Sequence, residues 1–169
     1  MAILKIAKMG HPLLLQKAKK VDDPTSPQIK KLVNDMLDTL NDLGGSGVGL
    51  AAPQVHISLQ VVIFEAGNDT KTSLITLINP KIEILTKETS IDWEGCLSVP
   101  GLRGKVSRPN KIKYTGFSLE GKKISTIAEG FDARVVQHEC DHLFGILYPQ
   151  RMEDLSSLQF VSEARHWPE

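Results

Sequence analysis

The strongest constraint on the fold is the pentapeptide His-Glu-Cys-Asp-His at residues 138–142. On a helix that advances about 100° per residue, His138 and His142 lie only roughly 40° apart, so both imidazoles can reach one metal ion. Cys140 is rotated roughly 200° from His138 and cannot bind the same ion. Glu139 flanks the pair, where a carboxylate can take a proton from water. The pattern predicts a metal-binding helix, although a chance match on an amphipathic helix is the alternative.

Composition limits the classes of protein that this chain can belong to. Its 169 residues are 41% hydrophobic and 24% charged, which is typical of one globular domain, so we expect a single domain over residues 1–169. Lysine plus arginine equal aspartate plus glutamate, 20 each, and we therefore predict no direct nucleic-acid binding and no membrane association. Lys5 and Lys8 interrupt the apolar N-terminal residues, which argues against a secretory signal and favours a cytoplasmic protein.

Helical periodicity appears in three segments. The first begins with Ser26 as the cap and Pro27 in the first turn, and the pair Gly44-Gly45 ends it. The second covers residues 131–144 with the metal motif on one face, and Gly145 stops it. A third, short helix is expected over residues 153–164.

Strands are expected where β-branched and aliphatic residues dominate between the helices. These segments are residues 59–64, 74–85 with a break at Asn79-Pro80, 111–119 and 122–128. A hairpin turn at Glu120-Gly121 joins the last two. We therefore predict an α+β fold, in which mainly antiparallel β-sheets pack around the central metal-binding helix, with an N-terminal helix and a short C-terminal helix.

A third metal ligand must come from outside the helix. Cys96 lies in Glu-Gly-Cys-Leu-Ser at residues 94–98, followed by Pro100, Gly101 and Gly104, and this composition predicts a loop able to bring a thiolate to the helix. In a reducing compartment a thiol near a histidine pair fits a ligand better than a disulfide. Taken alone, Cys96 also fits a small buried hydrophobic residue.

The stretch Gly-Val-Gly-Leu-Ala-Ala-Pro-Gln at residues 47–54 is rich in small residues and ends in an amide. Small residues permit close approach of the backbone to a ligand. The spacing matches neither a phosphate-binding loop nor a dinucleotide fingerprint. On its own the stretch could equally be a tight turn.

Together, residues 47–54, 94–98 and 137–143 resemble the three ordered motifs of the peptide deformylase family. The resemblance implies that Cys96, His138 and His142 bind a metal, which in the family is Fe2+, with Ni2+, Co2+ or Zn2+ as substitutes. Two imidazoles and one thiolate leave one position of a tetrahedral ion open, as catalytic sites require.

The resemblance also implies a reaction, a substrate and partners. The family removes the formyl group from the N-terminal formyl-methionine of nascent polypeptides and releases formate. Glu139 would accept a proton from the attacking water and pass it to the departing amine. The backbone N–H of Leu97 and the side-chain amide of Gln54 would stabilise the oxyanion.

Residues that match the family's substrate pocket surround these motifs. An apolar slot for methionine is implied at Val48, Gly49, Phe131 and Val135, although plain core packing would explain the apolar side chains equally well. Arg103 is implied to contact the substrate backbone beyond methionine, although a solvated charge on a loop would explain it equally well.

Two neighbouring acidic residues raise further expectations. Asp92 would place a polar group near the methionine slot. We expect Glu94 to orient a loop by pairing with Arg103 or Arg134.

The family includes members that dock on the ribosome through a basic C-terminal helix. In this chain residues 155–169 offer only Arg165 and His166 as cations. Transient association with the ribosome remains possible, but the tail does not support it.

Two other classes of protein share the helical motif. One subgroup of zinc peptidases needs a histidine at position 148, where Tyr148 excludes it, while another takes a downstream glutamate, for which Glu163 is a candidate. A binding protein with a purely structural metal would need a fourth protein ligand, and the sequence offers none that is evident. Metal binding by Cys96 would distinguish the zinc peptidases from the deformylase family, and metal analysis with a formate-release assay would distinguish the binding protein.

Overall fold

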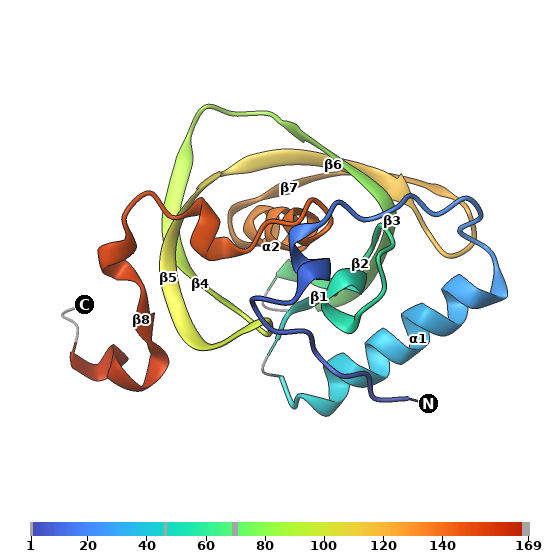
Figure 1. The fold of residues 1–169 in the computed structure, drawn as a ribbon. Coiled ribbons are helices and arrows are strands. Elements are labelled where there is room, and N and C mark those ends of the chain that lie inside the picture. Colours follow the sequence, from blue (N-terminus) through green and yellow to red (C-terminus); the bar gives the residue numbers. More distant parts are fainter. Residues whose placement is uncertain (1, 46, 69–70, 167–169) are drawn as a thin grey trace.

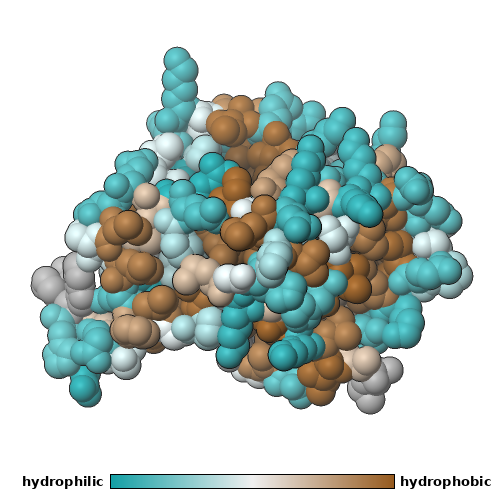
Figure 2. All heavy atoms as spheres, viewed as in Figure 1, coloured by the Kyte–Doolittle hydropathy of each residue, from teal (hydrophilic) through white to brown (hydrophobic). Residues whose placement is uncertain are grey.

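The computed structural model describes residues 2–45, 47–68 and 71–166. The helix with the metal motif, α2 (Gly130–His142), lies at the centre of the molecule, and two antiparallel sheets curve around it (Figure 1). This arrangement confirms the predicted α+β fold. On the face drawn in Figure 2, exposed apolar side chains form patches that hydrophilic side chains separate. Within the described ranges, no helix is both long and apolar enough to span a membrane.

The larger sheet has five strands in the order β1-β2-β3-β6-β7, and each neighbouring pair is antiparallel. Its strands are β1 (Gly49–Ala51), β2 (Val61–Asn68), β3 (Lys71–Ile84), β6 (Lys111–Phe117) and β7 (Lys123–Glu129). The predicted break at Asn79 is a bulge within one continuous strand, since the register shifts between Ile78 and Lys81. Asn79 adopts a φ of 52°, and its side-chain amide exchanges two hydrogen bonds with the backbone of Val21. These two bonds hold the bulge against the N-terminal segment.

Strand β2 is buried on both faces because one helix packs on each side of the large sheet. Val62 and Phe64 point into the core that contains α2. The alternate residues Val61 and Ile63 pack in a second core with α1 (Pro27–Asp42). Helix α1 begins directly after Ser26, as predicted, although the Ser26 side chain forms no capping hydrogen bond.

The smaller sheet has the order β4-β5-β8, with β4 (Thr89–Cys96), β5 (Val99–Pro109) and β8 (Gln159–Phe160). The loop predicted around Cys96 is wrong, because β4 and β5 form a hairpin with only residues 97–98 between them. Gly104 is required by packing instead of by a turn, since a Cβ there would lie 2.5 Å from Sδ of Met152. Cys96 is therefore fixed at the end of a strand.

The single helix predicted over residues 153–164 is replaced by shorter elements. These are the 3-10 helix η4 (Leu155–Ser157), strand β8 and the 3-10 helix η5 (Val161–His166). The segment pairs with the edge of β5, where Phe160 lies opposite Leu102 and Gln159 lies opposite Arg103. Strand pairing in the middle of the segment prevents one continuous helix. Three further 3-10 helices are η1 (Pro12–Leu15), η2 (Ala52–Val55) and η3 (Tyr148–Arg151).

Candidate active site

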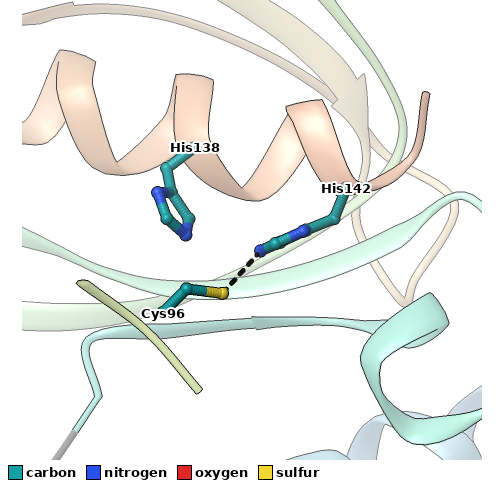
Figure 3. A group of neighbouring side chains, drawn as sticks. All are labelled: Cys96, His138 and His142. Atoms are coloured by element: carbon teal, nitrogen blue, oxygen red, sulfur yellow. Dashed lines mark hydrogen bonds between the residues drawn. The ribbon is translucent and has the colours of Figure 1, made fainter. Parts of the chain in front are cut away.

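Cys96, His138 and His142 converge between the end of β4 and helix α2 (Figure 3). One ligand atom from each lies within 4.8 Å of the others, and Cys96 Sγ is 3.4 Å from His142 Nε2. On a tetrahedral ion, bonds of about 2.3 Å to sulfur and about 2.0 Å to nitrogen place these two atoms roughly 3.5 Å apart. The donor set therefore fits a single metal ion with one position left open.

The other candidate ligands lie elsewhere. Cys140 is in the core on another side of α2, and burial raises the pKa of its thiol. Both cysteines are free thiols. Glu163 is exposed in η5 and lies 3.8 Å from His166, so the zinc-peptidase alternative that depends on it is wrong. Tyr148 is buried in the core of the small sheet.

The sulfur of Cys96 accepts hydrogen bonds from two groups beside the hairpin turn. The backbone N–H of Ser98 is 3.4 Å from Sγ, and the amide Nε2 of Gln54 is 3.5 Å from it. Gln54 is itself fixed, because its Oε1 accepts from the N–H of Ala51 and its Nε2 also donates to Ser98 Oγ. The structure thus brings Gln54 to the candidate metal ligands, with its amide nitrogen directed at the sulfur of Cys96.

Glu139 lies beside strand β1 with almost no exposed surface. Gly49 provides the space, since a Cβ at that position would lie 2.5 Å from Oε1 of Glu139. Its other oxygen, Oε2, has no hydrogen-bond partner in the described part of the chain. Burial raises the pKa of Glu139 to about 7, because the charged form is poorly solvated there. The carboxyl group is therefore suited to accept and release a proton near neutral pH.

Glu94 orients His138 through a buried ion-pair network that sequence reasoning found only in part. Its Oε2 lies 2.9 Å from Nδ1 of His138, and Arg134 donates to Oε1 as predicted. Arg103 is not a partner. Arg108, which the sequence did not single out, donates Nε to Oε1 at 2.9 Å and Nη2 to Oε2 at 3.0 Å.

The ionisation of Glu94 fixes the tautomer of His138. Burial would raise the pKa of Glu94, but hydrogen bonds from Arg108 and His138 hold it well below its usual range. A carboxylate only accepts, so Nδ1 of His138 carries the proton and Nε2 is left for a metal. By contrast, Nδ1 of His142 is buried and has no partner among the residues that the structure describes.

A cavity of about 650 Å³ opens beside the candidate metal ligands Cys96 and His138. All four residues implied for the methionine slot line it, together with Gln54 and Leu97 at the metal end; the four are Val48, Gly49, Phe131 and Val135. Arg103 does not line this cavity, and its guanidinium lies 4.2 Å from the ring centre of Trp93, which does. Asp92 is exposed and accepts from the N–H of Trp93, so the expectation of a polar wall is wrong.

Comparison with known proteins agrees with this geometry. The family model described as polypeptide deformylase matches residues 3–157. Peptide deformylase 1 of Nitrosomonas europaea is 48% identical over 165 residues, which cover 94% of this chain and 93% of that protein.

Solved structures agree in fold as well. Peptide deformylase from Thermotoga maritima has a TM-score of 0.84 and 35% identity, and the match covers 91% of this chain and all of that one. A class I type b peptide deformylase from Acinetobacter baumannii with bound Met-Ala-Ser has a TM-score of 0.82 and 36% identity, covering 89% and 99%.

Proposed function

Because this chain belongs to the peptide deformylase family, we propose that it removes N-terminal formyl groups in the cavity beside Cys96, His138 and His142. Deformylation is the activity of the family. The observation that carries the assignment of the site is the convergence of one thiol and two imidazoles at the end of a cavity that Glu139 also lines. These three residues would hold a metal with one coordination position left for water or substrate.

The metal is the one component that the chain does not supply. When bound, it acts as a Lewis acid that polarises the formyl oxygen and lowers the pKa of water. We assign Fe2+ as the native ion by analogy with the family, and Ni2+, Co2+ or Zn2+ as substitutes, because one thiolate and two imidazoles suit each of them.

The residues around the metal divide the remaining chemistry. Glu139 accepts the proton of the attacking water and delivers it to the departing amine. The amide of Gln54 and the backbone N–H of Leu97 donate to the oxyanion that forms at the formyl carbon, and loss of one such donor costs about 3–4 kcal/mol. The position of Gln54 supports this role, since Ala51 and Ser98 hold its side chain and the loss of its long contact with Cys96 Sγ alone would free an N–H for the oxyanion.

The substrates are nascent formyl-methionyl polypeptides. Their methionine occupies the slot formed by Val48, Gly49, Phe131 and Val135, and the related structure with bound Met-Ala-Ser supports this choice. Arg103 contacts the substrate beyond methionine, next to Trp93 at the cavity.

The wider setting follows from the substrate. Residues 1–169 act as one catalytic domain, because both sheets and α2 contribute to the cavity. Nascent chains are made in the cytoplasm, where we place this enzyme. Any encounter with the ribosome is transient, and we assign no docking role to the C-terminal residues.

The decisive assay measures formate released from formyl-Met-Ala-Ser by anaerobically purified protein, with metal content determined on the same sample. We expect wild-type protein to release formate and the variants Cys96→Ser and Glu139→Ala to lose turnover. Full metal content together with activity in Cys96→Ser would show that the ligand set is wrong. Cleavage of internal peptide bonds without formate release would overturn the proposed function.

A further inference from the structure

A chain of hydrogen-bonded charges continues from His138 past Glu94 and Arg108 to Asp141, one helical turn further along α2. Arg108, which holds both oxygens of Glu94, also donates Nη1 to Oδ2 of Asp141 at 2.6 Å. Arg151 of η3 donates two hydrogen bonds to the same carboxylate, with Nη2 2.6 Å from Oδ1 and Nε 3.1 Å from Oδ2. The chain thus extends from an imidazole at the active-site cavity to a half-exposed arginine.

The far end of this chain lies in a second cavity of about 570 Å³. Asp141, Arg108 and Arg151 line it, together with Cys140 of α2 and Phe144, which follows the helix. None of these residues lines the active-site cavity, so substrate does not contact them in the proposed arrangement. Any effect of Asp141 or Arg151 on the reaction is therefore indirect, and the ion pairs through Arg108 and Glu94 offer a route to His138.

We propose that Asp141 is a positioning residue for the metal ligand His138, acting through Arg108 and Glu94, and that Arg151 holds Asp141 in place. This inference rests on the proposed function, in which His138 binds the metal. It assigns a task to the acidic residue of the His-Glu-Cys-Asp-His motif that neither binds the metal nor moves a proton.

The physical reason is that two carboxylates share one buried guanidinium. Arg108 is 4% exposed and uses three nitrogens, two on Glu94 and one on Asp141, so its plane is fixed from both sides. Because Arg108 also pairs with Asp141, its positive charge neutralises the Glu94 carboxylate less. Glu94 is then a stronger hydrogen-bond acceptor for Nδ1 of His138. A stronger acceptor at Nδ1 makes the opposite nitrogen a better metal ligand.

The two histidine ligands differ in this respect. His142 has no hydrogen-bond partner at Nδ1 in residues 2–45, 47–68 and 71–166, whereas His138 is held by Glu94. Of the two histidines, only His138 can therefore transmit an effect of these buried charges to a bound metal.

The test compares Asp141→Asn, Arg151→Gln and Arg151→Lys with wild type. A matched control is Asp35→Asn, because Asp35 is also a buried aspartate paired with a cation, Lys31, but lies in α1. For each protein we would measure Zn2+ affinity by chelator competition and the visible absorption spectrum of the Co2+ form. Melting temperature and the separate values of kcat and KM complete the set.

We expect Asp141→Asn to lower Zn2+ affinity about tenfold, as changes to outer partners of metal-bound histidines do. Its Co2+ spectrum should shift, and kcat should fall while KM stays unchanged. Arg151→Gln should act in the same direction but less, and Arg151→Lys should restore part of the loss. Asp35→Asn should change only the melting temperature.

Wild-type Zn2+ affinity and Co2+ spectrum in Asp141→Asn, with only a lower melting temperature, would overturn the inference and leave Asp141 a purely structural residue. If Asp141→Asn does not fold, the half-exposed Arg151 decides, and an unchanged Co2+ spectrum in Arg151→Gln is then the contrary result. Retention of metal by His138→Ala would instead contradict the ligand set of the proposed function.

Discussion

At the level of single residues, Gly49 determines where the carboxylate of Glu139 can lie. A Cβ on Gly49 would lie 2.5 Å from Oε1, a distance that real side chains do not tolerate. Gly95 lines the same cavity, but a Cβ there would meet only the backbone oxygen of Leu102 at 3.7 Å. The two glycines therefore form a matched pair for substitution.

We predict that Gly49→Ala lowers kcat/KM for a formyl-methionyl peptide by about a hundredfold, because displacement of a catalytic group by about 1 Å has that effect. Gly95→Ala should remain within a few-fold of wild type. Equal losses in the two variants would show that Gly49 does not act by leaving space for Glu139.

The two cysteines differ in the environment of their thiols. Burial raises the pKa of Cys140, so that its reactive thiolate is scarce at neutral pH, whereas Cys96 is only half-buried at the cavity. We predict that iodoacetamide at pH 8 modifies Cys96 in metal-free protein and spares Cys140, and that Zn2+ protects Cys96. Peptide mass spectrometry measures both sites, and equally fast modification of Cys140 would contradict the prediction.

Residue roles were predictable where the information is local in sequence. The spacing of His138 and His142 defines one face of a helix, which is why the motif alone predicted a metal pair. Arg108 was missed because it lies 14 positions from Glu94, and only folding of the β4–β5 hairpin brings the two together. Asp92 was misplaced because proximity in sequence to Glu94 does not bring it to the cavity; its carboxylate is exposed and accepts from the N–H of Trp93 instead.

At the level of elements, the end of α2 sets the position of His142. The N–H of Gly145 donates to the carbonyl of His142, and the N–H of Ile146 reaches back to Asp141. Gly145 has a φ of 74°, and a Cβ there would lie 2.5 Å from the backbone of Leu15. The turn that ends α2 thus also lies against the backbone of η1.

We predict that Gly145→Ala lowers the free energy of unfolding by at least about 2 kcal/mol, since backbone strain and a steric clash add. Gly130, at the other end of α2, has a φ of 58° but open space around its Cβ position. Gly130→Ala should therefore cost only the backbone term, about 1–2 kcal/mol. Urea denaturation measures both, and equal costs would exclude the clash with Leu15.

Elements with one strong pattern were predicted well, and those shaped by tertiary pairing were not. Helix α1 and the β6–β7 hairpin follow from periodicity and turn residues. The glycines of β5 indicated a loop, yet Gly104 is small to admit Met152. The C-terminal segment has helical spacing, but its backbone bonds to β5 exclude a continuous helix.

At the level of the whole molecule, the metal joins parts that are far apart in the chain. Cys96 belongs to the small sheet, while His138 and His142 belong to the helix that packs on the large sheet. An ion bound by all three therefore connects the two sheets. Such an ion stabilises the folded state over the unfolded chain by mass action.

We predict that free metal at about a hundred times its dissociation constant stabilises the fold by about 2.7 kcal/mol. For a chain of this size the melting temperature should then rise by about 5–11 °C over the chelator-treated protein. Cys96→Ser should show a much smaller rise, and a full rise in that variant would contradict a metal link between the sheets.

The most direct test of the metal site is X-ray absorption at the iron edge of anaerobically prepared protein. We predict scattering from one sulfur at about 2.3 Å and from two imidazole nitrogens at about 2.0–2.1 Å. The sulfur contribution should vanish in Cys96→Ser and persist in Cys140→Ser. Iron without a sulfur neighbour, or sulfur scattering that survives in Cys96→Ser, would contradict the proposed ligand set.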